Sequence, residues 1–131
     1  IGAGALDQSQ TLARAYAAIR RQGGGAVAAH PAVQHMPSDI ELARQRIDMA
    51  LTALAQPVDT LDTGAVAAAR ANIAPALCHA ANQVMQVHGG IGYMRDAGPE
   101  KLVRDQNMLK LASGGTRHLH AFLAGGTGAR A

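Results

Sequence analysis

The sequence predicts an all-α fold: a four-helix up-down bundle followed by a short extra C-terminal helix. The length of 131 residues suits one domain with a single core. Apolar residues make up 48% of the chain but aromatic residues only 2%, so the core must consist of Leu, Ile, Val, Met and Ala. Such interiors favour closely packed helices over a β-sandwich. Apolar residues recur at helical spacing, without extended strand-like alternation. We expect one domain over residues 1–131, with a frayed tail over 125–131.

The first helix is expected to run from Leu6 to Arg20-Arg21, because its apolar residues recur every three or four positions. The two arginines suit the negative end of the helix dipole, and the glycines at 23–25 end the helix. The opening stretch Ile1–Ala5 contains two glycines, as in the dinucleotide-binding G-x-G-x-x-G motif. The third glycine would fall at Asp7 and no strand precedes it, so we reject a Rossmann interpretation.

The second helix is expected to be interrupted by proline. Pro31 can open a short helical turn, and Pro37 should then kink the chain because it lacks an N–H and clashes with the preceding turn. Ser38 or Asp39 is a suitable N-cap for a fresh start. The main helix is therefore predicted over about 38–55.

The longest helix is predicted over 61–87, with Asp59, Thr60 or Asp62 as its N-cap. It carries the clearest apolar stripe of the chain, and Pro75 inside it should cause a kink. The stripe consists of Val66, Ala69/Arg70, Ile73, Leu77, Ala80, Val84 and Val87.

This helix ends in the stretch 86–93, Gln-Val-His-Gly-Gly-Ile-Gly-Tyr. Its glycines allow the chain to turn and allow a ligand or another backbone to approach closely. Gly98-Pro99-Glu100 is a helix start, with proline suited to the first helical position. A last short helix carries Leu119 and Phe122.

Composition excludes several classes of function. A net charge of +3 with scattered basic residues and three aromatic residues does not predict nucleic-acid binding. A basic helical DNA-binding domain is also disfavoured, because no short turn joins a helix pair suited to groove reading. No apolar run reaches the roughly 18 residues of a membrane helix, and no signal peptide is visible. A single cysteine, Cys78, excludes an internal disulfide, and we expect a cytoplasmic protein.

Side chains that could carry chemistry on their own are scarce. The six histidines form no H-x-x-x-H or E-x-x-H pair, so no metal site is predicted. Cys78 lies in the middle of a largely apolar helix, and it and Met85 are expected to fill the core. Glu41 and Glu100 are the only glutamates, which leaves few candidates for a carboxylate base.

The glycine pairs at 89–90 and 114–115 each lie beside a helix end. The second pair precedes a helix opening with Thr116, where free N–H groups and the helix dipole favour an anion such as phosphate. Plain capping and turn formation would also explain both pairs, and composition alone favours that explanation. From the residues alone, both interpretations remain open.

Several stretches together resemble the C-terminal helical domain of the acyl-CoA dehydrogenase family. The stretch 86–96, Q-V-H-G-G-I-G-Y-M-R-D, resembles the family's glycine motif, and Val103-Arg104-Asp105 follows as in the family. The stretch 20–24 resembles the family's R-x-Q-F-G, and Gly115-Thr116 resembles its later Gly-Thr. The match covers nearly the whole chain in the right order.

The resemblance implies the FAD-docking and oligomerisation bundle of a flavoenzyme that oxidises the α,β bond of an acyl-CoA thioester. It implies that Arg20 and Gln22 contact FAD and that Thr116 is a further flavin contact. It also implies that part of the glycine motif meets the ADP part of FAD bound to a neighbouring subunit. These motif residues are Gln86, Val87, Gly89 and Gly90.

The chain departs from the family pattern at several places. Gly23 stands where the family has Phe, and His30-Pro31 replaces the usual Phe-Gln or His-Gln. Pro37 falls within a normally continuous helix, and the segment 104–116 is one residue longer than is typical. The usual catalytic Glu immediately precedes the Gly-Thr, and that place is held here by Gly114, so we expect no catalytic residue on this chain.

Two functions remain as expectations. In the first, the chain is the C-terminal bundle of an acyl-CoA dehydrogenase-like flavoprotein, and acyl-CoA binds only in the complete enzyme. Its partners are further copies, in a dimer or tetramer, or a subunit carrying the missing domains. In the second, a degenerate bundle has lost flavin and acts as an oligomerisation or interaction module. Gly23 and Gly114 favour the second; Arg20, Gln22 and the intact 86–92 motif favour the first.

Overall fold

Helices account for nearly all of the regular structure. A computed structural model describes residues 2–126. The elements are, in order, α1 (Gly2–Ile19), β1 (Arg21–Gln22), β2 (Gly25–Ala26), the 3₁₀ turn η1 (Val27–Ala29), α2 (Pro31–Gln34), α3 (Met36–Ala53), η2 (Val58–Thr60), α4 (Thr63–His88), η3 (Gly89–Tyr93), η4 (Arg95–Ala97), α5 (Pro99–Leu111), η5 (Ala112–Gly114) and α6 (Gly115–Gly126). The all-α prediction is therefore confirmed. Beyond α6, the rest of the expected frayed tail lies outside the described residues.

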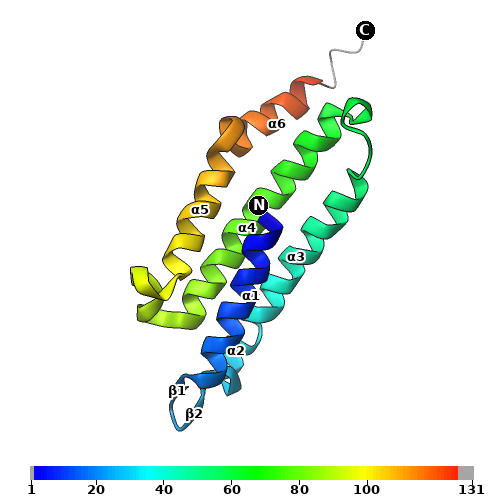
Figure 1. The fold of residues 1–131 in the computed structure, drawn as a ribbon. Helices are drawn as coiled ribbons and strands as arrows, with labels where there is room; N and C mark the ends of the chain where they lie inside the picture. Colours follow the sequence, from blue (N-terminus) through cyan, green and yellow to red (C-terminus); the bar gives the residue numbers. More distant parts are fainter. Residues whose placement is uncertain (1, 127–131) are drawn as a thin grey trace.

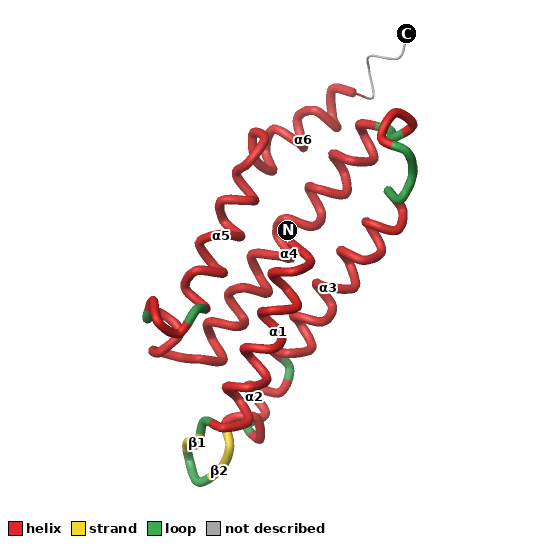
Figure 2. Tube along the Cα trace, in the orientation of Figure 1, coloured by secondary structure: helices red, strands yellow, loops and turns green. Residues whose placement is uncertain are grey.

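Four long helices lie side by side, and α4 is the central one. It packs against α1, α3, α5 and α6. Helices α1 and α4 run in the same direction, with α3 antiparallel to both, so α1 and α4 end at the same end of the bundle (Figure 1). The loops and the small hairpin lie at the ends of the bundle (Figure 2). No helix within residues 2–126 is long and apolar enough to cross a membrane.

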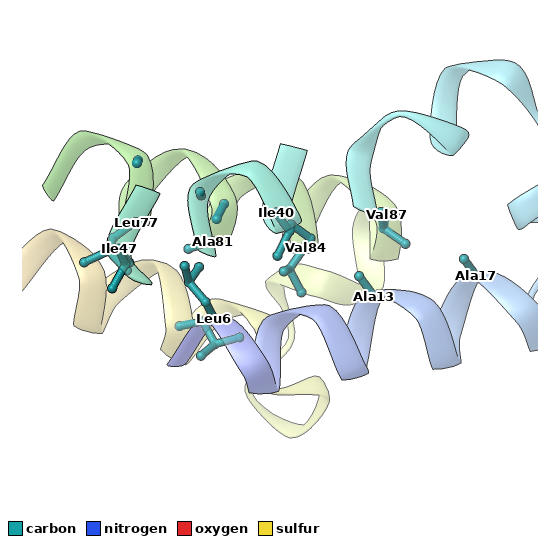
Figure 3. Packing of buried hydrophobic residues seen from close by; sticks show 13 residues of the cluster. Leu6, Ala13, Ala17, Ile40, Ile47, Leu77, Ala81, Val84 and Val87 are labelled. Atoms are coloured by element: carbon teal, nitrogen blue, oxygen red, sulfur yellow. The ribbon is translucent and has the colours of Figure 1, made fainter. Parts of the chain in front are cut away.

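The core is built from small and branched aliphatic side chains, as the composition predicts. Figure 3 shows Leu6 of α1, Ile47 of α3 and Leu77 of α4 turned toward a common interior. Leu6 is only 1% exposed. The other buried members of this cluster are Ala13, Ala17, Ile40, Ala43, Ala76, Ala80, Ala81, Val84, Val87 and Leu102.

Helix α4 begins at one of the three predicted caps. The carboxylate of Asp62 accepts a hydrogen bond of 2.8 Å from the backbone N–H of Ala65, which satisfies one of the free donors at the helix start. The helix continues through Pro75 to His88, and the kink expected at this proline stays a prediction. Val66 is predicted to lie in the buried stripe, but it is 37% exposed.

The predicted start of the second long helix was wrong by two residues. Helix α3 begins at Met36, with Pro37 in its first turn and His35 at the N-cap. A proline in the first turn removes an N–H that has no helical partner, so Pro37 opens α3 instead of kinking it. Ser38 and Asp39 therefore lie inside the helix and are not its caps.

The glycine stretch after α1 forms a hairpin that the sequence did not predict. Arg21 pairs with Ala26, and Gln22 pairs with Gly25, in antiparallel register. Gly23 and Gly24 form the turn with φ of 62° and 87°, angles that glycine adopts without steric cost. The hairpin projects from the end of the bundle where α1 stops (Figure 1).

Candidate functional site

A pocket lies at the end of the bundle where α1, the hairpin and the C-terminus of α4 meet. Its volume is about 490 Å³. Six of the seven candidate cofactor residues line it: Arg20, Gln22, Gln86, Val87, Gly89 and Gly90. The topology explains this meeting, because α1 and α4 run in the same direction and bring residues more than sixty positions apart to one end (Figure 1).

Arg20 gives the pocket a positive charge. Its side chain is exposed and forms no ion pair or hydrogen bond with any part of the chain that the structure describes. Its backbone is held firmly, since its N–H donates to the Tyr16 carbonyl at 2.9 Å and its carbonyl accepts from Val27 at 2.7 Å. Within residues 2–126, no carboxylate lines the pocket. An unpaired guanidinium without acidic neighbours suits an anionic ligand, above all a phosphate.

The glycines at the end of α4 differ in what they require. Gly89 has a φ of 58° and forms the C-cap of the helix, so its backbone conformation favours glycine. Gly90 has no positive φ, and a Cβ there would meet no atom within 4 Å. Nothing within the described chain therefore demands glycine at position 90. The absence of a side chain leaves open space on the pocket wall, where a ligand can approach the backbone.

The inner wall of the pocket is an aromatic pair that sequence reasoning missed. The rings of Tyr16 and His88 stack with centroids 4.3 Å apart. His88 is 6% exposed, and its Nδ1 lies 2.8 Å from the Val84 carbonyl oxygen, to which it must donate because a carbonyl only accepts. Two features of the sequence could have revealed this pair. His88 lies within the glycine motif, and Tyr16 lies one turn before Arg20. Three further lining residues that were missed are Val27, Val33 and Ile91.

The seventh candidate, Thr116, lies far from the other six. It belongs to the first turn of α6, at the opposite end of the bundle from the hairpin (Figure 1). Its hydroxyl oxygen is buried and has no hydrogen-bond partner among the groups that the structure describes. One further antiparallel helix, α5, carries the chain back across the bundle, so Thr116 cannot share a pocket with Arg20. The candidate residues therefore lie in two separate places, six of them in the pocket and Thr116 at the other end of the bundle.

Position 114, where the resemblance places the family's usual glutamate, has little room for any side chain. Gly114 has a φ of 88°, and a Cβ there would lie 2.8–2.9 Å from three side-chain carbons of His118. Beside this loop, the guanidinium of Arg70 donates to the carbonyls of Leu109 and Ala112 at 2.9 and 2.8 Å, which caps the end of α5. Two main-chain carbonyls at this loop thus have a hydrogen-bond donor without a carboxylate at 114.

Other reactive groups do not form a second site. Cys78 is half-buried and its thiol lies 3.5 Å from the Gln106 carbonyl. Burial raises the pKa of this thiol, an effect partly offset by the charge of Lys110, so the thiol is a poor nucleophile. Met85 is buried, as expected of a core side chain. Within residues 2–126, no group of three His, Cys, Asp or Glu side chains could hold a metal ion.

Comparison with known proteins decides the family. The family model described as "Acyl-CoA dehydrogenase, C-terminal domain" matches residues 1–124. The chain belongs to the acyl-CoA dehydrogenase family. The resemblance carried by the glycine motif and the Arg20 segment is thereby confirmed.

Curated relatives in this acyl-CoA dehydrogenase family are about three times longer. A probable acyl-CoA dehydrogenase, YngJ of Bacillus subtilis, is 33% identical over 118 residues, which cover 87% of this chain and 30% of YngJ. The 3-sulfinopropanoyl-CoA desulfinase of Paraburkholderia xenovorans is 33% identical over 127 residues, covering 95% of this chain and 31% of the desulfinase. The chain therefore spans less than a third of the length of these relatives.

Solved structures support the same fold. A protein described as an FAD-dependent dehydrogenase matches 97% of this chain with a TM-score of 0.86 and 24% identity, over 35% of its own length. The prolyl acyl carrier protein oxidase AnaB matches 97% of this chain with a TM-score of 0.87 and 19% identity, over 34% of its own length. At these identities the likeness establishes the fold alone.

Proposed function

We propose that this domain binds FAD and mediates oligomerisation in an acyl-CoA dehydrogenase-like flavoprotein. The observation that carries the proposal is the convergence of unpaired Arg20 with Gln22 and the segment 86–90 on one pocket without a carboxylate. We assign the ADP part of FAD to this pocket. Support comes also from structural relatives whose descriptions name FAD, among them the FAD complex of PigA.

The residues present fit the ADP group. The guanidinium of Arg20 matches pyrophosphate oxygens in charge and in fork geometry. The side-chain amide groups of Gln22 and Gln86 are exposed on the pocket walls and have both donors and acceptors for a polar group of the nucleotide. The open backbone at Gly90 lets a planar or charged group approach closely. Thr116 lies in a separate location, so we assign it to a second FAD molecule. The ADP part of the first FAD lies near Arg20.

The chemistry of a complete enzyme would be α,β-dehydrogenation of an acyl-CoA thioester. Bound FAD supplies the oxidising capacity for that reaction. The proton on the α-carbon needs a carboxylate base, and Gly114 leaves none at the usual place on this chain. The base, the acyl-CoA site and the remaining flavin contacts therefore come from other parts of the flavoprotein or from a partner subunit. This domain contributes binding and assembly.

Ligand titrations of the unchanged chain and of two variants, at the neighbouring residues Arg20 and Arg21, test the cofactor assignment. ADP and FAD are added separately to the purified chain, followed by calorimetry and by amide chemical shifts of residues 86–91. Arg20→Ala should weaken binding of both by about tenfold or more, the usual cost of losing a charged hydrogen bond. Arg21→Ala is the matched control, since Arg21 is also exposed but does not line the pocket. Failure of the unchanged chain to bind either ligand would overturn the assignment.

A second candidate function is an interaction module without flavin. Gly23 and Gly114 favour it, and so do large exposed apolar side chains, with exposures of 77% for Ile19, 71% for Tyr93 and 61% for Met94. Both functions include self-association, so sedimentation of the chain should detect a dimer or larger species. The ADP titration separates them, because the interaction module predicts an oligomer that binds no nucleotide.

A further inference from the structure

The hairpin that carries Gln22 into the pocket is too small to hold its own shape. Its ladder consists of two residue pairs, and its turn consists of Gly23 and Gly24. Isolated two-stranded hairpins, even longer ones, are marginal in water. Two glycines at the turn add conformational freedom to the unfolded hairpin. A contact from outside the ladder must therefore help to fix the position of Gln22.

His30 provides such a contact. Its Nε2 lies 2.9 Å from the carbonyl oxygen of Gln22 and must donate to it, because the oxygen can only accept. The ring lies beside the turn, since an ideal Cβ on Gly23 would be 3.3 Å from its Cε1. The backbone of His30 is itself anchored: its N–H donates to Val27 at 3.1 Å, and its carbonyl accepts from Val33 at 2.9 Å.

We propose that His30 is a positioning residue for the pocket: its imidazole holds the hairpin so that Gln22 and Arg20 face the ligand. The link to Arg20 runs through Val27, whose N–H donates to the Arg20 carbonyl at 2.7 Å. His30 does not line the pocket and acts through these residues. The ligand part of the inference rests on the proposed function, whereas the effect on the hairpin does not.

The ring of His30 also lies where a side chain at position 23 would begin. A side chain on Gly23 would press against this ring and would have to adopt a φ of 62°. In this conformation of the turn, the imidazole therefore takes space that a side chain at 23 would need. Space and backbone angle both favour glycine here, and the hydrogen bond from His30 holds the turn in this conformation.

Three variants test the role of His30. His30→Phe keeps a ring but removes the donor, His30→Gln keeps a donor near the position of Nε2, and His35→Ala is the control. His35 is an exposed histidine whose side chain forms no hydrogen bond within the described chain. The measurements are hydrogen exchange at the Val27 amide, ADP affinity, and the midpoint of thermal unfolding.

His30→Phe should speed exchange at Val27 and weaken ADP binding, each by about three- to tenfold, the factor that one neutral hydrogen bond contributes. The unfolding midpoint should change little, because the hairpin lies outside the core. In His30→Gln, Val27 exchange and ADP affinity should both return most of the way to the values of the unchanged chain. His35→Ala should change neither quantity.

Unchanged Val27 exchange in His30→Phe would overturn the role in the hairpin. Faster exchange with unchanged ADP affinity would overturn the role in ligand positioning. Absence of ADP binding by the unchanged chain would instead overturn the proposed function, and the exchange data would still decide whether His30 holds the hairpin.

Discussion

At the scale of single residues, the packing around Gly92 leaves no room for a Cβ. A Cβ at this position would lie 2.8 Å from the carbonyl oxygen of Met85 and 3.1 Å from the Cβ of His88. Because the first of these is a backbone atom, the last turns of α4 would have to move. We expect Gly92→Ala to lower the free energy of unfolding by about 1–3 kcal/mol, as for other overpacked sites.

Gly90→Ala is the matched control for this prediction. The two glycines lie two positions apart in the same motif, but a Cβ at 90 meets no atom within 4 Å and the φ is not positive. Its effect should stay within about 0.5 kcal/mol, as for ordinary surface changes. Urea unfolding followed by circular dichroism measures both. Equal losses in the two variants would contradict the packing argument.

The glycine motif could be found in the sequence, but the task of each glycine could not. Gly89 is needed for its backbone angle, Gly92 for packing, and Gly90 for neither. These differences depend on atoms that lie next to each glycine only after the helix has ended and turned. The stack of Tyr16 on His88 was missed for a similar reason, since it joins two helices across the bundle.

At the scale of elements, Glu41 links α3 to α1 and makes that link sensitive to acid. Its carboxylate accepts from Gln10 of α1 at 2.9 Å and from Gln45 at 3.3 Å, and Arg44 lies 3.4 Å away. The hydrogen bond from Gln10 is the largest of the causes that hold the pKa of Glu41 below its ordinary value of 4.5. The ionised form is thus favoured by folding.

The sign of the pH dependence follows from this lowered pKa. The stabilisation is fully present above the pKa of Glu41 in the unfolded chain and is lost as the pH falls through the lower pKa in the folded chain. For the unchanged chain, the urea concentration at the unfolding midpoint should therefore decrease as the pH is lowered below about 4.5. In Glu41→Gln this acid loss should be smaller, because the amide does not titrate. Asp59→Asn, on the exposed turn η2, is the control and should leave the acid loss unchanged.

Element boundaries were predictable where the signal was local. Asp62 caps α4 through a contact three residues away, which the order of residues alone suggests. The start of α3 was predicted wrongly at Pro37, because a proline is equally suited to end one helix and to open the next. The hairpin was missed because two residue pairs carry no periodic signal, and its support from His30 comes from outside the ladder.

At the scale of the whole molecule, alanine obscured the central place of α4. The sequence suggested one apolar stripe, but α4 is buried on several sides by alanines at 67, 71, 74, 76 and 81. Alanine is common on both exposed and buried helix faces, so its pattern does not reveal how many neighbours a helix has. The division of the candidate site was in principle predictable. Helices in an up-down bundle alternate in direction, which places Arg20 with Gln86 and leaves Thr116 at the other end.

The central position of α4 predicts that the two ends of the molecule unfold together. Leu6 of α1 is 1% exposed and belongs to the core cluster that spans α1, α3, α4 and α5. Leu6→Ala should cost about 2–5 kcal/mol, the range for leucines in closed cores. That is a large part of the roughly 5–15 kcal/mol that stabilises a typical domain. Leu51→Ala, at a leucine of α3 that is 53% exposed, is the control and should cost less than about 1 kcal/mol.

Urea titrations of these variants should be followed by amide signals at both ends, from Val87 at the end of α4 and from Leu119 in α6. Because α4 runs between the two ends and packs against α1, α3, α5 and α6, Leu6→Ala should shift both transitions equally. Leu119 packs on Ala67 and Ala71 in a separate small cluster, which makes it the most sensitive reporter of independent behaviour. A transition at Leu119 that stays in place while that of Val87 shifts would mean that the core around Leu6 does not couple the Arg20 pocket to the Thr116 end.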